Sequence, residues 1–245
     1  MFKQKKALAI VLDLKGYYLK MAQTMVGSDA LPKEYEECFK CLLDSCPSEP
    51  FNVIKDIVEA ELGVPLDSVY DSFDPTPLGS ASIGQVHRAE LKLRGGGSHG
   101  VVVKVQYPKV EAMFNMDVQT MKIMCALVDD YGDAINDLCD DMGRMFKDEF
   151  DYTKEASMLR ECSENLPPHF RTRAVIPLPI DVKHPLFAQS TFIGPKGLCT
   201  RKVLTMEEVK GTPIKAKLKA LMSQFAQSQG ISVAQLEARF KDDMQ

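Results

Sequence analysis

The chain has 245 residues, which is long enough for one large domain or two small ones with a buried core. Hydrophobic residues make up 45% and charged residues 26%, a balance that favours a globular protein over a disordered chain. The formal net charge of −4 gives no basic excess of the kind that duplex binders carry, so nucleic acid is not expected as a partner.

The first 62 residues are expected to be helical. Apolar side chains recur at helical spacing over 5–26, Pro32 opens a second helix over 32–43, and a third is predicted over 52–62. The N-terminus resembles neither a signal peptide nor an Arg-rich transit peptide, and no apolar run approaches the roughly 18 residues of a membrane span. We therefore expect an untargeted protein or a chain that lacks an upstream segment.

Seven cysteines are scattered along the chain, and this odd number favours a reducing compartment with free thiols. Cys38 and Cys41 could begin a zinc site, but no second Cys/His pair follows them at a useful spacing. In the predicted helix over 32–43 the two residues are simply neighbours. No metal site is therefore predicted.

The pattern changes after Asp74-Pro75-Thr76-Pro77, which marks the start of a new unit. Strands are predicted over 82–93 and 101–107, and the glycine-rich residues between them predict a hairpin. Two helices, two further strands and two polar helices around Gly230 are expected over 109–131, 134–163, 187–193, 201–207 and 215–243. Helices that alternate with hairpins in this order are typical of the N-lobe of a kinase.

A loop of small residues joins the break to the first strand: Gly79, Ser80, Ala81 and Ser82. Small side chains let the backbone approach a ligand closely, and the N–H groups of such a turn can bind phosphate oxygens. Taken alone, the loop is equally compatible with an ordinary tight turn.

The next strand carries Val101-Val102-Val103-Lys104. A kinase has Val-Ala-Ile-Lys at this point, and its lysine contacts the α and β phosphates. From the pattern alone, Lys104 either finds an anion near the core or faces solvent on the polar side of its strand.

Acidic residues gather on the predicted helix over 134–163. Glu149 lies in line with an apolar stripe, whereas Asp151 and Glu155 are i, i+4 neighbours on another part of the surface. A carboxylate that faces the core needs a cation, and Lys104 is a candidate. The alternative is a solvated acidic face. On the first helix, Lys20 and Gln23 share a face, with ordinary surface positions as the alternative.

Together these motifs resemble the UbiB/ADCK family of atypical kinase-like proteins. Lys20-Met21-Ala22-Gln23 resembles the KxGQ motif, and Gly79 to His87 resembles the Ala-rich loop and its tail. Lys104 resembles the phosphate-contacting lysine, and Glu155 the acid that pairs with it. Glu149 and Asp151 resemble the ExD pair of the family, and the strand with Met206 and Glu207 resembles the one that leads to the adenine-contacting hinge.

The resemblance implies an α+β fold, a protein-kinase-like N-lobe with an antiparallel sheet and an N-terminal helical extension. The expected divisions are a KxGQ-type extension over 1–62, an N-lobe with hinge over 63–211, and the helical start of a C-lobe over 212–245. Lys20, Gln23, Glu149 and Asp151 would gate the cleft. We expect an ion pair between Lys104 and Glu155, and we expect Lys20 and Gln23 to face the nucleotide.

The implied ligand is adenine nucleotide, ATP or ADP, with Mg²⁺ only where a C-lobe supplies its ligands. The family is linked to coenzyme Q and other prenyl-lipid metabolism, so lipid-biosynthesis proteins or a membrane surface are further partners that the resemblance allows. Its members act in mitochondria, plastids and bacteria, and this sequence does not choose among these locations.

Three departures from the family pattern stand out. Ala22 replaces the glycine of KxGQ, and Gly79 and Ser80 stand at two alanine positions of the loop. None of the four histidines begins a His-x-Asp motif, and Asp-Phe-Gly does not occur in the sequence. We therefore expect a chain that stops before the catalytic loop, with no catalytic or metal-binding aspartate. It would be part of an atypical kinase or ATPase, an inactive scaffold, or a gene-model fragment.

Overall fold

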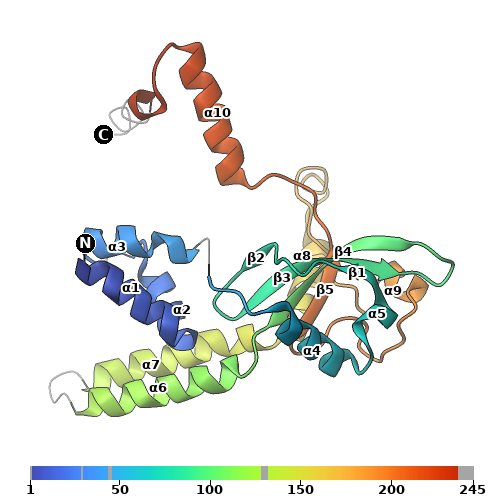
Figure 1. Ribbon diagram of the computed structural model, residues 1–245, viewed down its shortest axis with the longest axis horizontal. Coiled ribbons are helices and arrows are strands. Elements are labelled where there is room, and N and C mark those ends of the chain that lie inside the picture. The colour runs from blue at the N-terminus through green and yellow to red at the C-terminus, as the bar shows by residue number, and fades with distance from the viewer. Residues whose placement is uncertain (1, 29, 44–45, 128–131, 237–245) are drawn as a thin grey trace. The chain divides into compact units, whose positions relative to one another are not determined.

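The computed structural model describes residues 2–28, 30–43, 46–127 and 132–236 (Figure 1). They belong to two compact units, Met1–Glu208 and Val209–Gln245, which are treated separately below. The predicted divisions at residues 62 and 211 stay predictions.

The first unit opens with α1 (Phe2–Leu14), α2 (Gly16–Met25), α3 (Lys33–Phe39) and the 3-10 helix η1 (Lys40–Leu43). The expectation of one helix over 5–26 is wrong, because the backbone turns at Lys15 and Gly16, whose φ angles are +56° and +45°. Apolar periodicity continues across this break, which is why the sequence pattern conceals it. Leu19 and Ala22 of α2 pack with Phe39 and Leu42 to form a small core.

An antiparallel sheet forms the centre of this unit. Its strands follow the order β1 (Tyr70–Phe73), β3 (Gly84–Lys92), β4 (Ser98–Gln106) and β5 (Val203–Glu207), and β2 (Gly79–Ser80) pairs with β3. The predicted hairpin is confirmed as β3 and β4, in which Val86 lies opposite Lys104. On β4, side chains alternate between the two faces: Val101, Val103 and Val105 are buried, and Lys104 projects to the other side.

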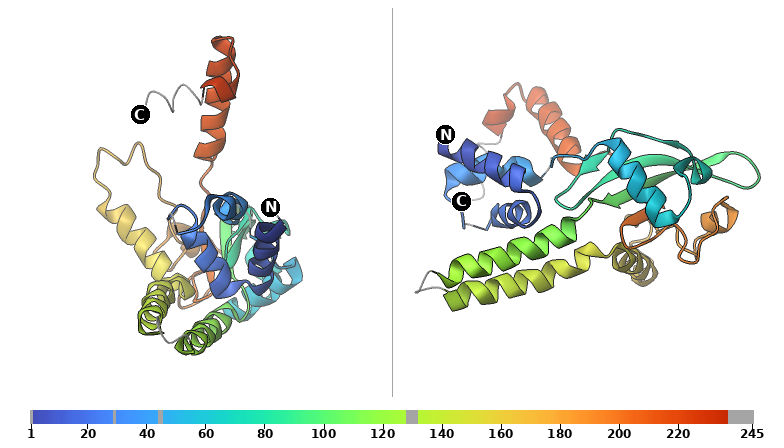
Figure 2. Two further views of the ribbon diagram at one scale, coloured as in Figure 1. Left: turned by 90° about the vertical axis from the view of Figure 1, so that its left-hand side faces the viewer. Right: turned by 60° about the horizontal axis from the view of Figure 1, so that its bottom comes forward.

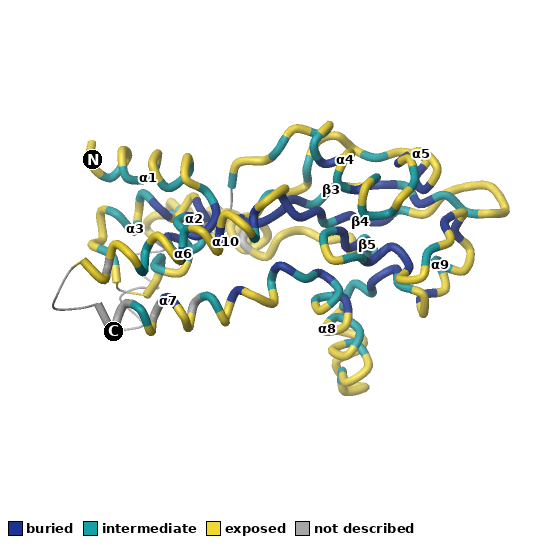
Figure 3. Tube along the Cα trace, turned by 90° about the horizontal axis from the view of Figure 1, so that it is seen from below, coloured by how far each residue is buried: buried dark blue, intermediate teal, exposed yellow. Residues whose placement is uncertain are grey.

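The main hydrophobic core follows these strands, as the buried positions in Figure 3 show. Helices α4 (Phe51–Leu62) and α5 (Leu66–Val69) lead from the N-terminal helices to β1. The predicted helix over 52–62 is confirmed, and it ends where Gly63 takes the left-handed conformation expected of a glycine that follows a helix. The predicted strand over 201–207 is confirmed as β5.

The predicted strand over 187–193 is wrong. Instead, α9 (Pro185–Gln189) begins there, because Pro185 occupies its first turn and the His184 ring accepts the N–H of Leu186. Only an isolated bridge between Ser190 and Leu93 remains of the expected pairing.

Helices α6 (Val110–Ala126) and α7 (Gly132–Lys147) lie side by side, and α2 packs against α6 (Figures 1 and 2). The expectation of one continuous helix over 134–163 is wrong. After α7 the chain forms the 3-10 helix η2 (Asp148–Phe150), becomes extended at Asp151, and then begins α8 (Tyr152–Asn165). This break places Glu149 in η2 and Glu155 in α8, on two different elements.

The second unit contains α10 (Ile214–Ser228), which ends before Gly230, whose φ is +67°. The first of the two polar helices predicted over 215–243 is confirmed. The second is helical over 233–236, and the rest of its predicted range lies outside the described residues.

Candidate functional site: a lysine–glutamate pair beside a small-residue loop

The expected ion pair between Lys104 and Glu155 is confirmed. The Nζ atom of Lys104 on β4 donates to both carboxylate oxygens of Glu155 on α8, at 2.8 and 2.7 Å. The ammonium group also lies 4.7 Å from the centroid of the Tyr152 ring. About a quarter of the Lys104 side chain and somewhat more than a third of that of Glu155 remain exposed, so the pair is not sealed in the core.

The start of α8 places Glu155 where it can meet the lysine. Asp151 caps this helix by accepting the Thr153 backbone N–H at 3.0 Å and its hydroxyl at 2.6 Å. These donors hold the pKa of the Asp151 carboxyl below its usual value. The backbone N–H of Tyr152 donates to the carbonyl oxygen of Arg201, which ties α8 to the segment that enters β5.

Lys20 meets one of the two expected acids. Its Nζ atom lies 2.8 Å from a carboxylate oxygen of Glu149 and 4.8 Å from the centroid of the Phe146 ring. Asp151, in contrast, is occupied by its helix cap. The break at η2 separates the two acids, so they do not act as neighbours on one helix.

Gln23 makes contacts different from those of Lys20. Its side-chain amide donates to the carbonyl oxygen of Leu42 at 2.8 Å and to the sulfur of Cys46 at 3.4 Å. The backbone N–H of Cys46 in turn donates to the carbonyl oxygen of Ser80 at 3.4 Å. Through Cys46, the helix that carries Lys20 and Gln23 is therefore connected to the small-residue loop.

The small-residue loop is a tight turn that joins β2 to β3. Gly79 and Ser80 pair with Val86 and Gln85, and the N–H of Ala81 donates to the carbonyl oxygen of Gly84 at 2.8 Å. Gly79 and Ala81 are exposed, Ser80 is half-buried and Ser82 is buried. The loop thus presents backbone at its tip and is held firmly at its base.

Sequence reasoning missed the polar side chains beneath this loop. Gln85 and His87 on β3 are almost fully buried, and Gln85 bonds to the backbone of Glu49. The sequence did contain a signal of this burial. Gln85 and His87 continue the alternate positions of Ala89 and Leu91, so all four lie on the buried face of β3.

Met206 and Glu207, expected near adenine, both lie within the sheet. Met206 pairs with Val102, and the backbone N–H of Glu207 donates to the carbonyl oxygen of Leu178 at 3.0 Å. The Glu207 carboxylate accepts the N–H of Leu178 and lies 3.3 Å from the His184 ring. The N–H of Glu207 is therefore already engaged by the chain itself.

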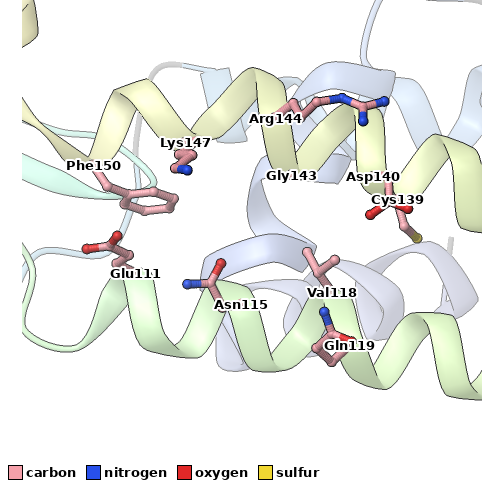
Figure 4. A pocket seen from close by; sticks show the side chains of 10 residues that line it. All are labelled: Glu111, Asn115, Val118, Gln119, Cys139, Asp140, Gly143, Arg144, Lys147 and Phe150. Carbon is pink, nitrogen blue, oxygen red and sulfur yellow. The ribbon is translucent and has the colours of Figure 1, made fainter.

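A cavity of about 370 Å³ lies elsewhere, between α6 and α7 (Figure 4). Glu111 and Asn115 of α6 face Arg144 and Lys147 of α7 across it, with Phe150 at one end. Neither Lys104 nor Glu155 lines it, so this cavity is separate from the site built on their ion pair.

The described residues contain neither a cluster of metal-binding side chains nor a membrane-spanning helix. Among residues 2–28, 30–43, 46–127 and 132–236, no three His, Cys, Asp or Glu side chains gather as a metal would require. Within the same ranges, no helix has both the length and the apolar character needed to cross a bilayer.

An antiparallel sheet, a strand lysine and a paired helix glutamate define a kinase-like N-lobe. Comparison with known proteins agrees: residues 41–242 match the family model described as the ABC1 atypical kinase-like domain. The chain belongs to this family, as the resemblance predicted.

Its curated relatives bear several names. The Arabidopsis thaliana protein ACTIVITY OF BC1 COMPLEX KINASE 8, chloroplastic, is 32% identical over 86% of this chain and 26% of the relative. A probable protein kinase UbiB of Shewanella woodyi is 38% identical over 46% of this chain and 20% of the relative. A solved Mycobacterium tuberculosis protein in complex with erythromycin is 25% identical, covering 86% of this chain and 49% of that one, with a TM-score of 0.49. In these alignments the chain spans about a quarter or less of the length of the two curated relatives.

Proposed function

We propose that this chain binds adenine nucleotide, ATP or ADP, through the surface formed by Lys104 and the small-residue loop. The observation that supports this proposal most directly is the contact of the Lys104 ammonium with both carboxylate oxygens of Glu155. A lysine held in this way keeps its position while about a quarter of its side chain stays exposed. Phosphate oxygens are the anions that a kinase-like lobe brings to such a lysine.

Each residue of the proposed site has a distinct role. Lys104 contacts phosphate oxygens, Glu155 orients Lys104, and the backbone of residues 79–82 covers the phosphates. Four further residues shape the entrance. Lys20 and Glu149 act through their ion pair. Gln23 acts through its bond to Leu42 of η1, and Asp151 through its cap on α8. Adenine would lie against the end of β5, next to Met206 and Glu207.

Chemical turnover requires groups that these 245 residues do not supply. Kinases hold Mg²⁺ with an aspartate and an asparagine of the C-lobe and use a His-x-Asp acid near the attacking hydroxyl. The sequence has neither His-x-Asp nor Asp-Phe-Gly. We therefore propose that this chain binds nucleotide without hydrolysing it, and that Mg²⁺ acts only when a C-lobe provides its ligands.

The biological setting is proposed from the relatives. A relative named UbiB supports a link to coenzyme Q or another prenyl-lipid pathway, in which the partners are lipid-biosynthesis proteins or a membrane surface. Two Arabidopsis relatives are described as chloroplastic, which supports an organellar location, plastid or mitochondrion. In this setting the chain is part of an atypical kinase or ATPase, with an inactive scaffold as the alternative.

Titration of the purified chain with a fluorescent ATP analogue tests the binding. We expect saturable binding that Lys104→Met weakens by about tenfold, corresponding to the loss of one charge-assisted hydrogen bond. Lys92→Met is the matched control, because Lys92 lies on β3 of the same sheet and contacts Asp67 and Asp71 instead. Equal binding by the wild type and Lys104→Met would contradict the proposal.

Phosphate release in the presence of Mg²⁺ and ATP tests the absence of turnover separately. We expect a rate no greater than that of Lys104→Met. A faster rate that Lys104→Met abolishes would refute the proposed lack of turnover while leaving nucleotide binding intact.

A further inference from the structure

Two buried polar side chains on β3 have no role in the proposed nucleotide contacts. Gln85 and His87 are 1% and 0% exposed, and their i, i+2 spacing places them on the same face of the strand. The hydrogen bonds around them form one connected set that links Asp74, His87, Gln85 and Glu49.

The partners of His87 determine its tautomer. Its Nδ1 atom lies 2.7 Å from the backbone carbonyl oxygen of Asp74, which can only accept, so Nδ1 carries the proton. Its Nε2 atom lies 2.9 Å from the side-chain nitrogen of Gln85, which can only donate, so Nε2 is the acceptor. His87 is therefore neutral in this arrangement.

Both ends of the Gln85 amide bond to the backbone of one residue, Glu49. Its Oε1 accepts the backbone N–H of Glu49 at 2.7 Å, and its Nε2 donates to the Glu49 carbonyl oxygen at 3.2 Å. The second Nε2 proton goes to His87. Flipping the amide would break both bonds to Glu49, so the acceptor nitrogen of His87 fixes the only productive orientation of Gln85.

Glu49 ends a short segment, residues 46–49, that lies against the small-residue loop. The N–H of Cys46 donates to Ser80, and the hydroxyl of Tyr107 donates to the carbonyl oxygen of Pro47 at 3.1 Å. Gln23 contacts Cys46 from the other side. Residues 46–49 are thus held at one end by Gln85 and at the other by the loop and Gln23.

We propose that His87 and Gln85 form a latch that positions residues 46–49 against the small-residue loop, and that the latch opens when His87 takes up a proton. Protonation places an N–H on Nε2, directly facing the amide protons of Gln85. Gln85 must then turn its oxygen toward His87. The backbone N–H of Glu49 thereby loses its acceptor and faces the NH₂ group of Gln85, which is also a donor.

The surroundings favour the closed latch at neutral pH. His87 packs against the rings of Phe51 from α4 and Phe73 from β1, and this burial lowers its pKa below the ordinary value. Asp74 acts in the opposite direction, by accepting the Nδ1 proton and by its charge. Glu49 lies beyond Gln85, and its carboxylate is paired with Lys15 at 2.8 Å.

The sign of the pH effect follows. Because the folded protein holds His87 neutral, the latch is fully formed above the unfolded pKa of histidine, about 6.5. It is lost as pH falls from there through the lower folded pKa. The latch itself needs no nucleotide; only its effect on access to the loop rests on the proposed function.

Amide hydrogen exchange at Glu49 tests the latch directly, because this N–H is the group that Gln85 accepts. We expect its protection, corrected for the intrinsic pH dependence of exchange, to fall by about tenfold on acidification, the effect of losing one ordinary hydrogen bond. Amides in the middle of β4 serve as an internal reference for the intact fold. Constant protection of Glu49 from pH 8 down to the pH at which the β4 amides also lose protection would overturn the proposal.

Variants separate the latch from other acid effects. Gln85→Leu should lose the protection of Glu49 at every pH, whereas His87→Gln can supply an acceptor oxygen that does not titrate and should keep protection independent of pH. His99→Gln is the matched control, since His99 is an exposed histidine on β4 and its loss should leave the wild-type profile unchanged. Unchanged protection of Glu49 in Gln85→Leu would contradict the latch.

A measurement on the wild type keeps the proposal testable if the variants fail to fold. The ¹⁵N chemical shifts of the His87 ring should show a protonated Nδ1 and an unprotonated Nε2 at pH 8. The opposite tautomer would overturn the proposal, whatever the result of a nucleotide-binding experiment.

Discussion

Lys104 and Glu155, 51 residues apart in sequence, form a two-oxygen ion pair over the ring of Tyr152. Both charged side chains stay partly exposed, whereas Tyr152 is buried. Partly exposed pairs contribute little to stability because water screens them and their side chains lose entropy. The pair is therefore expected to contribute little to the stability of the fold.

This difference predicts a small loss of stability when Lys104 is replaced and a large loss when Tyr152 is replaced. Lys104→Met should lower the free energy of unfolding by less than about 1 kcal/mol, the range of exposed pairs. Tyr152→Ala removes a buried ring and should cost about 3–5 kcal/mol. Urea denaturation of both variants measures the two values. A loss in Lys104→Met as large as that in Tyr152→Ala would mean that the ion pair is mainly structural.

The pairing of Lys104 with Glu155 could be predicted because both residues belong to motifs in a fixed order. The hairpin of β3 and β4 could also be predicted, since its strands alternate and a glycine-rich turn joins them. The breaks at Lys15 and at Asp148–Asp151 could not, because helical periodicity continues through both. At both breaks the course of the backbone depends on contacts with residues distant in sequence, which a local pattern does not reveal.

The contact between Gln85 and Glu49 illustrates the same limit. The two residues are 36 positions apart, and nothing in the segment around Glu49 indicates that its backbone needs a partner. Helical spacing predicted that Lys20 and Gln23 share a face of one helix. In the structure Lys20 donates to Glu149, whereas Gln23 donates to Leu42 and Cys46, so the two side chains contact different segments of the chain.

The ion pair between Lys20 and Glu149 predicts a measurable coupling between α2 and η2. A double-mutant cycle with Lys20→Met and Glu149→Gln should give about 0.5–1 kcal/mol, since Lys20 is partly buried and lies near the Phe146 ring. The exposed pair Lys154–Asp148 provides the control cycle and should give less. High salt should reduce both couplings, and a Lys20 coupling no greater than that of the control would contradict this prediction.

The cap at Asp151 predicts a loss of stability that depends on pH. Asp151→Ala should cost about 1 kcal/mol at neutral pH, whereas Asp151→Asn, which keeps an acceptor oxygen, should cost less. Because Thr153 lowers the pKa of Asp151 in the folded state, the charged cap stabilises above the unfolded pKa of about 3.9. The difference between wild type and Asp151→Ala should therefore shrink as pH falls below that value.

Thermal unfolding at pH 7 and pH 3 measures this difference. Asp148→Ala, at an exposed neighbouring position, is the control and should change stability by less than about 0.5 kcal/mol. A cost for Asp151→Ala that is equal at both pH values would show that the carboxylate charge plays no part in the cap.

Gly84 is the residue at which the small-residue loop enters β3, and the space around it excludes any side chain. A Cβ atom added there would lie 2.5 Å from the carbonyl oxygen of Val105 and 2.6 Å from the hydroxyl of Tyr152. That hydroxyl is itself buried without a hydrogen-bond partner in the described part of the chain. Close packing between the loop, β4 and α8 thus depends on the bare backbone at this position.

Gly84→Ala should therefore lower the free energy of unfolding by about 1–3 kcal/mol, the usual cost of overpacking, and weaken nucleotide binding by displacing the loop from Lys104. Gly79→Ala and Gly95→Ala are matched controls, because both positions have open space and neither requires a positive φ angle. Adding Tyr152→Phe to Gly84→Ala should restore only part of the stability, since the clash with the Val105 backbone remains. Urea denaturation of the four variants measures the effects on stability, and nucleotide titration of Gly84→Ala beside Gly95→Ala, which lies outside the loop, measures the effect on binding. A Gly84→Ala protein as stable as Gly79→Ala would contradict the packing described here.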